Sequence, residues 1–228
     1  MFAHPDDAEF ICSGTVARFV QSGYRVQYVL ATSGDKGSHD ISLTPTQLGA
    51  MREAEQLKAA QVLGVEEVTF LRHLDGEVEV NIPFRRELAN VIRKGRPDVV
   101  LTFDPWQHYQ IHPDHRAVGQ TALDAVAAAR DPMYYPEQFV DGITEQRVHN
   151  VYFFSTDHPN YYVNITSTME RKIEALLAHR SQIGSRDIAE FVRARARVVG
   201  AEIGVEFAEA FHYLPMMRPP ELNRHPNW

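Results

Sequence analysis

An α/β fold, with a mostly parallel sheet covered by helices on both faces, is predicted by two features of the sequence. Segments typical of buried strands alternate with segments of helical periodicity through the first two-thirds of the chain, as in proteins built on parallel sheets. The 228 residues suffice for one such domain, and no repeat, low-complexity block or linker divides them. We therefore predict a single domain over residues 1–228.

The predicted elements follow from periodicity and from the residues that start or stop them. A helical pattern follows the first charged residues and stops at Ser22-Gly23, and Gly64 ends a long amphipathic helix. Runs rich in Val, Tyr and Phe predict the strands. The predicted strands span 25–32, 67–71, 98–103, 148–155 and 161–165, with 206–212 either a strand or a helix end. The later predicted helices span 46–63, 83–96, 115–129, 167–178 and 185–199.

Three segments depart from this regular pattern. Only three apolar residues precede His4, whereas a strand takes about five or six; we expect a very short first strand or a sequence that lacks part of it. Residues 132–146 are irregular and are predicted to form an active-site flap. The proline-rich tail, residues 215–228, is predicted to be extended, as an arm over a neighbouring subunit. Such an arm would make the protein a homo-oligomer, such as a trimer or hexamer.

Composition excludes several classes of protein. The net charge of -7 and the pI near 5.9 argue against a nucleic-acid partner, which requires a basic face. The single cysteine, Cys12, excludes an intramolecular disulfide and fits a reducing compartment. The sequence shows neither a membrane-spanning apolar run nor a signal peptide, so we expect a cytoplasmic protein. No Gly-x-Gly-x-x-Gly motif follows the first strand, which disfavours nucleotide-dependent oxidoreduction.

Two histidine-carboxylate stretches, HPDD at 4–7 and HPDH at 112–115, each follow a predicted strand. In open α/β sheets, ligands bind beyond the carboxyl ends of the strands. Each stretch alone could be only a helix start, since aspartate and proline favour the first turn. Together, His4, Asp7 and His115 form a two-histidine, one-carboxylate set with a position left for water, as in catalytic zinc sites. Ferrous oxygenases use the same ligand types.

The residues beside this set favour hydrolysis. Asp6 is not needed as a ligand, so its carboxylate could take a proton from a metal-bound water. His112 lies one helical turn before His115 and is expected to face the same pocket, where its cation would stabilise a developing oxyanion. Asp114 is expected near enough to orient or charge the imidazole of His112.

With these two stretches, the sequence resembles the LmbE/PIG-L superfamily of metal-dependent de-N-acetylases. Further matching motifs are Gly14-Thr15, Gly34-Asp35-Lys36-Gly37, Arg52-Glu53-Ala54-Glu55, Asp75-Gly76 and His179-Arg180-Ser181-Gln182. The resemblance implies a Rossmann-like fold and Zn²⁺, or another divalent metal such as Fe²⁺, held by His4, Asp7 and His115. It also implies that Asp6 is the general base, which later protonates the leaving amine, with His112 as its electrostatic partner.

The resemblance further implies substrate contacts for Arg52, Asp75 and Tyr109. Arg52 would reach substrate polar groups, Asp75 would reach sugar hydroxyls, and Tyr109 would match a tyrosine that precedes the second motif in some members. The alternative for Arg52 is a surface pair with Glu53 or Glu55 on its own helix. The alternative for Asp75 is a turn residue before glycine.

The sequence therefore predicts a zinc-dependent amidohydrolase that removes an acetyl or similar acyl group from a small amino sugar or its conjugate. Two alternatives stay open: a non-catalytic sugar- or metal-binding protein of the same fold, and a zinc esterase or thiol-conjugate amidase. In one departure from the family, Ala8 stands where many members have glutamate, and the acid follows at Glu9. His179 either serves the site or ends a helix favourably.

Overall fold

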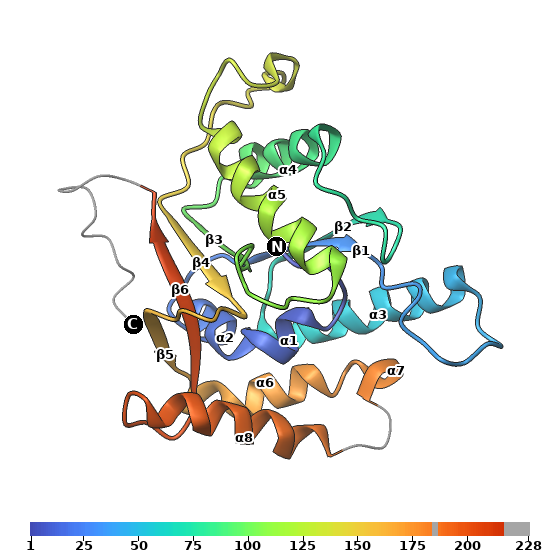
Figure 1. The fold of residues 1–228 in the computed structure, drawn as a ribbon, viewed down its shortest axis with the longest axis vertical. Helices are drawn as coiled ribbons and strands as arrows, with labels where there is room; N and C mark the ends of the chain where they lie inside the picture. Colours follow the sequence, from blue (N-terminus) through green and yellow to red (C-terminus); the bar gives the residue numbers. More distant parts are fainter. Residues whose placement is uncertain (184–186, 217–228) are drawn as a thin grey trace.

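A computed structural model describes residues 1–183 and 187–216 of the chain, which form a mixed α/β fold with two sheets (Figure 1). Strand β1 (Gln27–Thr32) pairs in parallel with β2 (Glu67–His73). The second sheet has the order β3 (Val99–Phe103), β4 (Asn150–Phe154), β6 (Ala208–Pro215) and β5 (Tyr161–Asn164). β3 and β4 are parallel, whereas β6 runs antiparallel to β4 and to β5. The α/β class is confirmed; a mostly parallel sheet is not, because the last two strands pair antiparallel.

The first three residues lie between the two sheets and hydrogen-bond to both. The backbone N–H of Phe2 donates to the carbonyl of Val29 (2.8 Å), and the amino group of Met1 donates to the carbonyl of Leu101 (2.6 Å). Burial lowers the pKa of this amino group to about 5. Beside it, a cavity of about 280 Å³ is lined by residues at the starts of β1 and β3. Residues 1–3 thus form an isolated parallel bridge, between Phe2 and Leu30, and lead directly to His4.

Helices cover both faces of the strands (Figure 1). On one side lie α4 (Ile82–Gly95) and α5 (Pro113–Ala129), and on the other α1 (Asp7–Ile11), α2 (Ser13–Gln21) and α3 (Pro45–Leu63). The later helices are α6 (Met169–Leu176), α7 (Arg180–Ile183) and α8 (Ile188–Ala201), with single 3-10 turns at Pro136–Gln138 and Thr166–Thr168. α6 packs against α2 and α3, so the late helices extend the second layer outward. Among the described residues, no helix is both long enough and apolar enough to cross a membrane.

Local signals fix the ends of α3. The Thr44 side chain accepts a hydrogen bond from the N–H of Gln47, whose own side chain accepts one from the N–H of Thr44. This capping box, with Pro45 in the first turn, starts the helix. Gly64, at φ 81°, ends it. With both ends fixed, the inner face of α3 carries Arg52 toward the first histidine motif.

The helical pattern after the first motif forms two helices, which meet at Cys12 (φ −136°). The carboxylate of Glu209, in β6, accepts hydrogen bonds from the N–H groups of Gly14 (3.1 Å) and Thr15 (2.7 Å) at the start of α2. Lys172 of α6 lies 2.7 Å from the same carboxylate. The interruption between α1 and α2 thus leaves backbone N–H groups free to bind Glu209, 195 residues away along the chain. The helical periodicity of the sequence could not predict this interruption.

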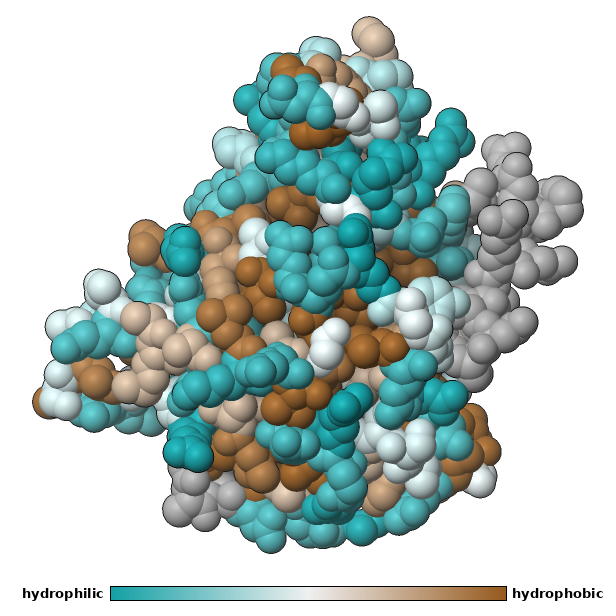
Figure 2. Space-filling model, turned by 180° about the vertical axis from the view of Figure 1, so that it is seen from behind, coloured by the Kyte–Doolittle hydropathy of each residue, from teal (hydrophilic) through white to brown (hydrophobic). Residues whose placement is uncertain are grey.

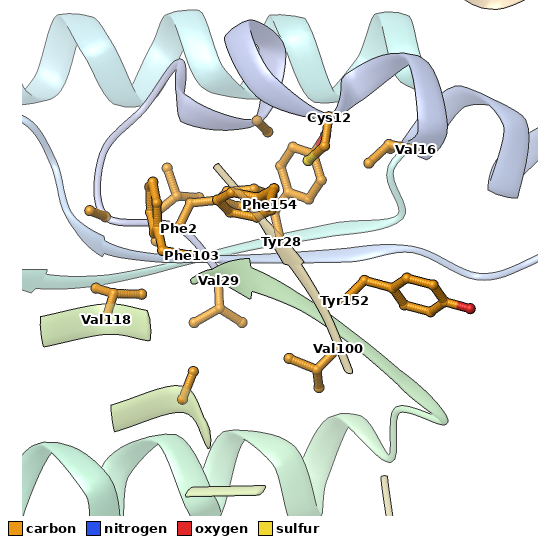
Figure 3. Packing of buried hydrophobic residues seen from close by; sticks show 14 of the residues in the cluster. Phe2, Cys12, Val16, Tyr28, Val29, Val100, Phe103, Val118, Tyr152 and Phe154 are labelled. Atoms are coloured by element: carbon orange, nitrogen blue, oxygen red, sulfur yellow. The ribbon is translucent and has the colours of Figure 1, made fainter. Parts of the chain in front are cut away.

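Packed aromatic side chains surround Phe2, which precedes the first motif (Figure 3). The ring of Phe2 stacks on Phe154 with centroids 5.4 Å apart, and it meets Tyr28 edge-on at 5.1 Å. Phe154 also contacts Phe103 at 4.7 Å. Because all four rings are buried, the backbone that leads into His4 is firmly placed.

On the face opposite that of Figure 1, hydrophobic residues gather over the middle of the molecule, and hydrophilic residues predominate at its upper end (Figure 2).

The predicted active-site flap, residues 132–146, lies away from the histidine motifs. It follows the end of α5, whereas the second motif lies at the start, and a helix of 17 residues is about 25 Å long. The buried guanidinium of Arg93 anchors the segment by donating to the carbonyls of Asp131 (3.0 Å) and Tyr134 (2.9 Å) and to the side chain of Gln138 (2.7 Å). The flap prediction is therefore wrong: the irregular sequence forms an anchored connection at the far end of α5.

Two further predictions reach residues outside the described part of the chain. In the predicted extended tail, Pro215 is the last residue of β6, and residues 217–228 are not described. The predicted helix over 185–199 corresponds to α8, which begins at Ile188. Asp187 caps it by accepting a hydrogen bond from the N–H of Glu190 (3.2 Å).

Candidate active site and metal centre

Asp7, the first residue of α1, connects the two histidine motifs. Its Oδ2 accepts hydrogen bonds from the backbone N–H groups of Ala3 (3.0 Å) and His4 (2.8 Å). The same oxygen lies 3.6 Å from Nδ1 of His4, while Oδ1 lies 3.2 Å from Nε2 of His115. The carboxylate therefore contacts both histidines with which the sequence groups it.

Three imidazole rings meet at the start of α5. His112 is the N-cap residue of this helix, and its Nδ1 accepts a hydrogen bond from the N–H of Asp114 (3.3 Å). The ring centroid of His4 lies 4.5 Å from that of His112 and 5.2 Å from that of His115. Phe103, the last residue of β3, stacks on His115 at 4.1 Å. The core thus holds the second motif in place against the first.

The donor atoms at this point fit a divalent metal ion. Two groups of described residues offer donor atoms within 4.8 Å of one another: His4, His112 and His115; and His4, Asp75, His112 and Asp114. Asp7 belongs to neither group, but its oxygens contact both His4 and His115. Imidazole nitrogens and carboxylate oxygens suit Zn²⁺, and Fe²⁺ accepts the same donors.

Carboxylates face both nitrogens of His4. Nε2 lies 3.0 Å from Oδ2 of Asp114 and 3.1 Å from Oδ1 of Asp75, and Nδ1 faces Asp7. Histidines that bind metals usually donate their second N–H to a carboxylate in this way. Burial alone would lower the pKa of His4, but hydrogen bonds with the three carboxylates, that of Asp114 foremost, raise it to about 11. The negative charge of these carboxylates also favours a metal ion, which binds in place of the proton on the ring.

The carboxylate of Asp114 contacts the ring of His4 rather than that of His112. Besides His4, it contacts the backbone N–H groups of Gly76 (2.7 Å) and Val78 (3.2 Å). The hydrogen bond between Asp114 and the ring of His112 comes from the backbone N–H of Asp114, not from its carboxylate. Burial, and then the charge of neighbouring His4, lower the pKa of His112. The charge of Asp114 does raise the pKa of His112, as expected, but burial and the charges of His4 and His115 outweigh it, so the cationic form of His112 is not favoured.

Asp6 has the features of a reactive carboxylate rather than those of a helix cap. It is the N-cap residue of α1, yet its side chain makes no capping hydrogen bond. Its backbone has φ 96° and ψ −22°, a strained conformation for a residue other than glycine. Burial raises the pKa of its carboxyl to about 7; Arg52 opposes this rise and Asp7 adds to it. Such a group can accept and return a proton near neutral pH.

Arg52 holds the turn that carries Asp6. Its side chain is 4% exposed and donates to the carbonyls of Pro5 (2.6 Å) and Gly34 (2.8 Å) and to Oδ2 of Asp6 (3.2 Å). A side chain at Gly34 would collide with this guanidinium, and Gly34 has φ 65°. The alternative of a surface pair with Glu53 is wrong, because that carboxylate binds Ser33 and Arg72 instead. Glu55 likewise binds a different residue, Ser181.

The structure brings Asp75, but not Tyr109, to the site. Asp75 accepts a hydrogen bond from the N–H of Lys36 (3.0 Å) and contacts His4. Burial would raise the pKa of Asp75, but the hydrogen bond and charge of His4 lower it to about 2. Tyr109 lies in the loop before α5, is 96% exposed, and its ring lies 6.3 Å from that of the neighbouring His108.

Comparisons with known proteins show the family to which the chain belongs. The family model of GlcNAc-PI de-N-acetylases, PIG-L, matches residues 1–126, which contain both histidine motifs. The chain belongs to this family. A diacetylchitobiose deacetylase of Thermococcus kodakarensis is 34% identical over 93% of this chain and 80% of the relative. A probable N-acetyl-alpha-D-glucosaminyl L-malate deacetylase 2 of Bacillus anthracis is 27% identical over 82% of this chain and 81% of the relative.

The fold is shared with a solved structure of the N,N'-diacetylchitobiose deacetylase from Pyrococcus horikoshii in complex with its inhibitor MPG. The two structures have a TM-score of 0.90 and 33% sequence identity, over 97% of this chain and 86% of that chain. The resemblance to the LmbE/PIG-L superfamily is thereby confirmed.

In this PIG-L family member, two buried polar residues near Asp6, Gln56 and Glu9, were not predicted as part of the site, whereas His179 was one of the alternatives. Gln56 accepts a hydrogen bond from the backbone N–H of Asp6 (3.0 Å) and contacts Glu9, which in turn contacts His179. Gln56 follows Arg52 by four residues and so lies on the same face of α3. That spacing is the one signal in the sequence that could have indicated it.

Proposed function

We propose that this chain is a metal-dependent N-deacetylase that acts on the N-acetylglucosamine unit of a small sugar or sugar conjugate. Its family and two relatives, one acting on diacetylchitobiose and one on a glucosaminyl malate, support this substrate class. The observation that carries the proposal is the position of Asp6. Its carboxyl, with a pKa near 7, lies beside a cluster of histidines and carboxylates that fits a metal ion.

His4, Asp7 and His115 would hold the metal. The bound ion would polarise the acetyl carbonyl and lower the pKa of a water molecule. Asp114 and Asp75 would keep the ring of His4 in place through its Nε2. Asp7 is itself positioned by the hydrogen bonds that its Oδ2 accepts from two backbone N–H groups.

Asp6 would move the proton. Its carboxylate takes a proton from the attacking water as the oxygen bonds to the acetyl carbon. When the carbon–nitrogen bond breaks, Asp6 gives this proton to the leaving amine, so that acetate and the free amino sugar are the products. A pKa near neutrality suits both steps, because the same group must accept and release a proton.

His112 would bind the developing oxyanion as a neutral donor. Since its Nδ1 accepts the N–H of Asp114, the proton of the neutral ring lies on Nε2. Burial lowers the pKa of His112, which also favours the neutral form. A fixed N–H donor aimed at the reacting carbonyl stabilises the transition state without carrying a charge.

The test is to assay purified protein of known metal content against N-acetylglucosamine, N,N'-diacetylchitobiose and glucosaminyl conjugates, measuring released acetate and free amine together. We expect equal amounts of both products from at least one of these substrates. Binding of the sugars without turnover would favour the non-catalytic sugar-binding alternative. Cleavage of esters or thiol conjugates, with all N-acetyl sugars left intact, would favour the other hydrolases.

A further inference from the structure

A buried line of polar side chains leads from His179, between α6 and α7, to the backbone of Asp6. Nε2 of His179 lies 3.1 Å from Oε2 of Glu9, and Nε2 of Gln56 lies 3.1 Å from Oε1 of the same carboxylate. Oε1 of Gln56 then accepts the backbone N–H of Asp6 at 3.0 Å. His179, Glu9 and Gln56 are 0%, 0% and 1% exposed, so water cannot replace these contacts.

The line has a fixed direction of hydrogen bonding. The oxygens of a carboxylate can only accept, so both His179 and the amide of Gln56 donate to Glu9. The amide of Gln56 therefore has one favourable orientation, with its NH₂ toward Glu9 and its oxygen toward Asp6. If the carboxylate of Glu9 were absent, the amide of Gln56 could flip. Its NH₂ group would then face the N–H of Asp6, and neither group could accept a hydrogen bond from the other.

This oxygen supports a strained part of the chain. Asp6 has φ 96° and makes no side-chain cap, so few contacts hold its backbone. Strained conformations of this kind persist only where the surroundings enforce them. On one side Arg52 binds the carbonyl of Pro5, and on the other Gln56 binds the N–H of Asp6. Together they hold the single peptide group between Pro5 and Asp6 at both its carbonyl and its N–H.

We infer that Gln56, oriented by Glu9 and His179, is a positioning residue that holds Asp6 in the pose required of the general base. The inference rests on the proposed function, since it concerns the base of that reaction. A displacement of about 1 Å in a catalytic group can cost on the order of 100-fold in rate. Gln56 would thus affect the chemical step without touching substrate or metal.

The first test is kinetic. Gln56→Met keeps the size of the side chain but removes both hydrogen bonds, so kcat should fall by about 10–100-fold, as for other residues that support an active site. KM and metal content should not change. Gln56→Glu should be equally impaired, because two carboxylates then face each other at this position. The exchange Glu9→Gln with Gln56→Glu restores every donor and acceptor, so it should recover kcat relative to Gln56→Glu alone.

Glu55→Gln is the matched control. Glu55 is the neighbouring residue on α3, is 7% exposed and accepts hydrogen bonds from Ser181, but it makes no contact with Asp6. This variant should lose stability and keep kcat. A Gln56→Met enzyme that loses stability as the control does, but retains full kcat, would overturn the inference. An exchange variant that folds but is no faster than Gln56→Glu would do so as well.

A second measurement separates this inference from the proposed function. Hydrogen exchange at the Asp6 amide, followed by NMR of labelled protein, should accelerate in Gln56→Met and stay slow in Glu55→Gln. If the unmodified protein deacetylates no amino sugar, the proposed function fails, and this exchange rate alone decides whether Gln56 holds Asp6. An Asp6 amide that stays equally protected in Gln56→Met would show that it does not.

Discussion

Two clusters of buried charged side chains lie at the starts of α1 and α2, and they differ in how fully their charges are balanced. At the start of α2, Glu209 and Lys172 form a one-to-one pair, and both oxygens of Glu209 also accept backbone N–H groups. At the start of α1, carboxylates are in excess around His4. They are those of Asp6, Asp7, Asp75 and Asp114.

The difference separates structural from chemical use of buried charge. In the balanced cluster every oxygen has a partner, so it fixes the backbone of α2 and leaves no capacity for a ligand. In the unbalanced cluster, hydrogen bonds with the excess carboxylates raise the pKa of His4 to about 11, while burial, to which the charge of Asp7 adds, raises the pKa of Asp6 to about 7. Such a cluster binds cations and exchanges protons.

Removing a metal ligand should have the largest effect. His115→Ala leaves two of three proposed ligands, so we expect loss of most metal and a fall in activity of more than about 100-fold, since even residues that only support ligands cost 10–100-fold. His112→Ala is the control and should keep its metal, because His112 is not among the proposed ligands. Elemental analysis of both variants checks this, and full occupancy in His115→Ala would contradict the ligand assignment.

Removing the base should affect rate without affecting metal. Asp6→Asn keeps the size of the side chain but cannot accept the proton, so kcat should fall by about 10²–10⁴-fold, the usual contribution of general acid–base catalysis. Metal content and sugar affinity should be preserved. Steady-state kinetics with metal analysis measures this. Hydrolysis at the original rate by Asp6→Asn would exclude Asp6 as the base.

The sequence predicted which residues belong to this unbalanced cluster better than it predicted which of them contact one another. His4, Asp7 and His115 could be predicted because each motif follows a strand and the carboxyl ends of strands share one edge. The partner of Asp114 could not, since two histidines lie within its reach and only the packing of α5 decides between them. The contact between Gln56 and Glu9 depends on the packing of α3 against α1, which no local pattern encodes; only the spacing of four residues from Arg52 places Gln56 on the same face of α3.

The fold shows the same limit. Capping residues and periodicity predicted most helices closely, because those signals are local. The break between α1 and α2 depends on Glu209, and the antiparallel direction of β6 depends on the path of the chain after α8. The flap prediction failed for a reason available in the sequence: the length of α5 separates residues 132–146 from the second motif.

Breaking the balanced cluster should reduce stability and spare the chemistry. Glu209→Gln leaves Lys172 as an unpaired buried cation, which should cost about 3–5 kcal/mol in the free energy of unfolding. Glu190→Gln is the control: its pair with Arg197 has the same 2.7 Å separation as the buried pair but is exposed, and should be worth less than about 1 kcal/mol. Denaturant unfolding gives both values. Equal losses in the two variants would mean that burial does not distinguish these pairs.

The smallest effect we expect is a shift in pH dependence that reports on the charge near Asp6. Its pKa is raised to about 7 by burial, and Arg52 opposes the rise. Activity requires the carboxylate, so kcat/KM should increase with pH as Asp6 loses its proton. A bound metal ion also favours the carboxylate and should place this acid limb at or below pH 7. Arg52→Gln removes a cation, so the pKa of Asp6 rises and the limb moves to higher pH, by about 1 unit or more.

Arg52→Lys separates this charge effect from the hydrogen bonds. It keeps the positive charge but loses the paired contacts to the carbonyls of Pro5 and Gly34. The limb should therefore stay near its original pH while kcat falls, because the turn that carries Asp6 is less well held. Profiles of kcat/KM against pH for the three proteins test this. If the limb moves equally in both variants, Arg52 acts on Asp6 through the backbone alone, and the unbalanced charge is not what sets the acid limb.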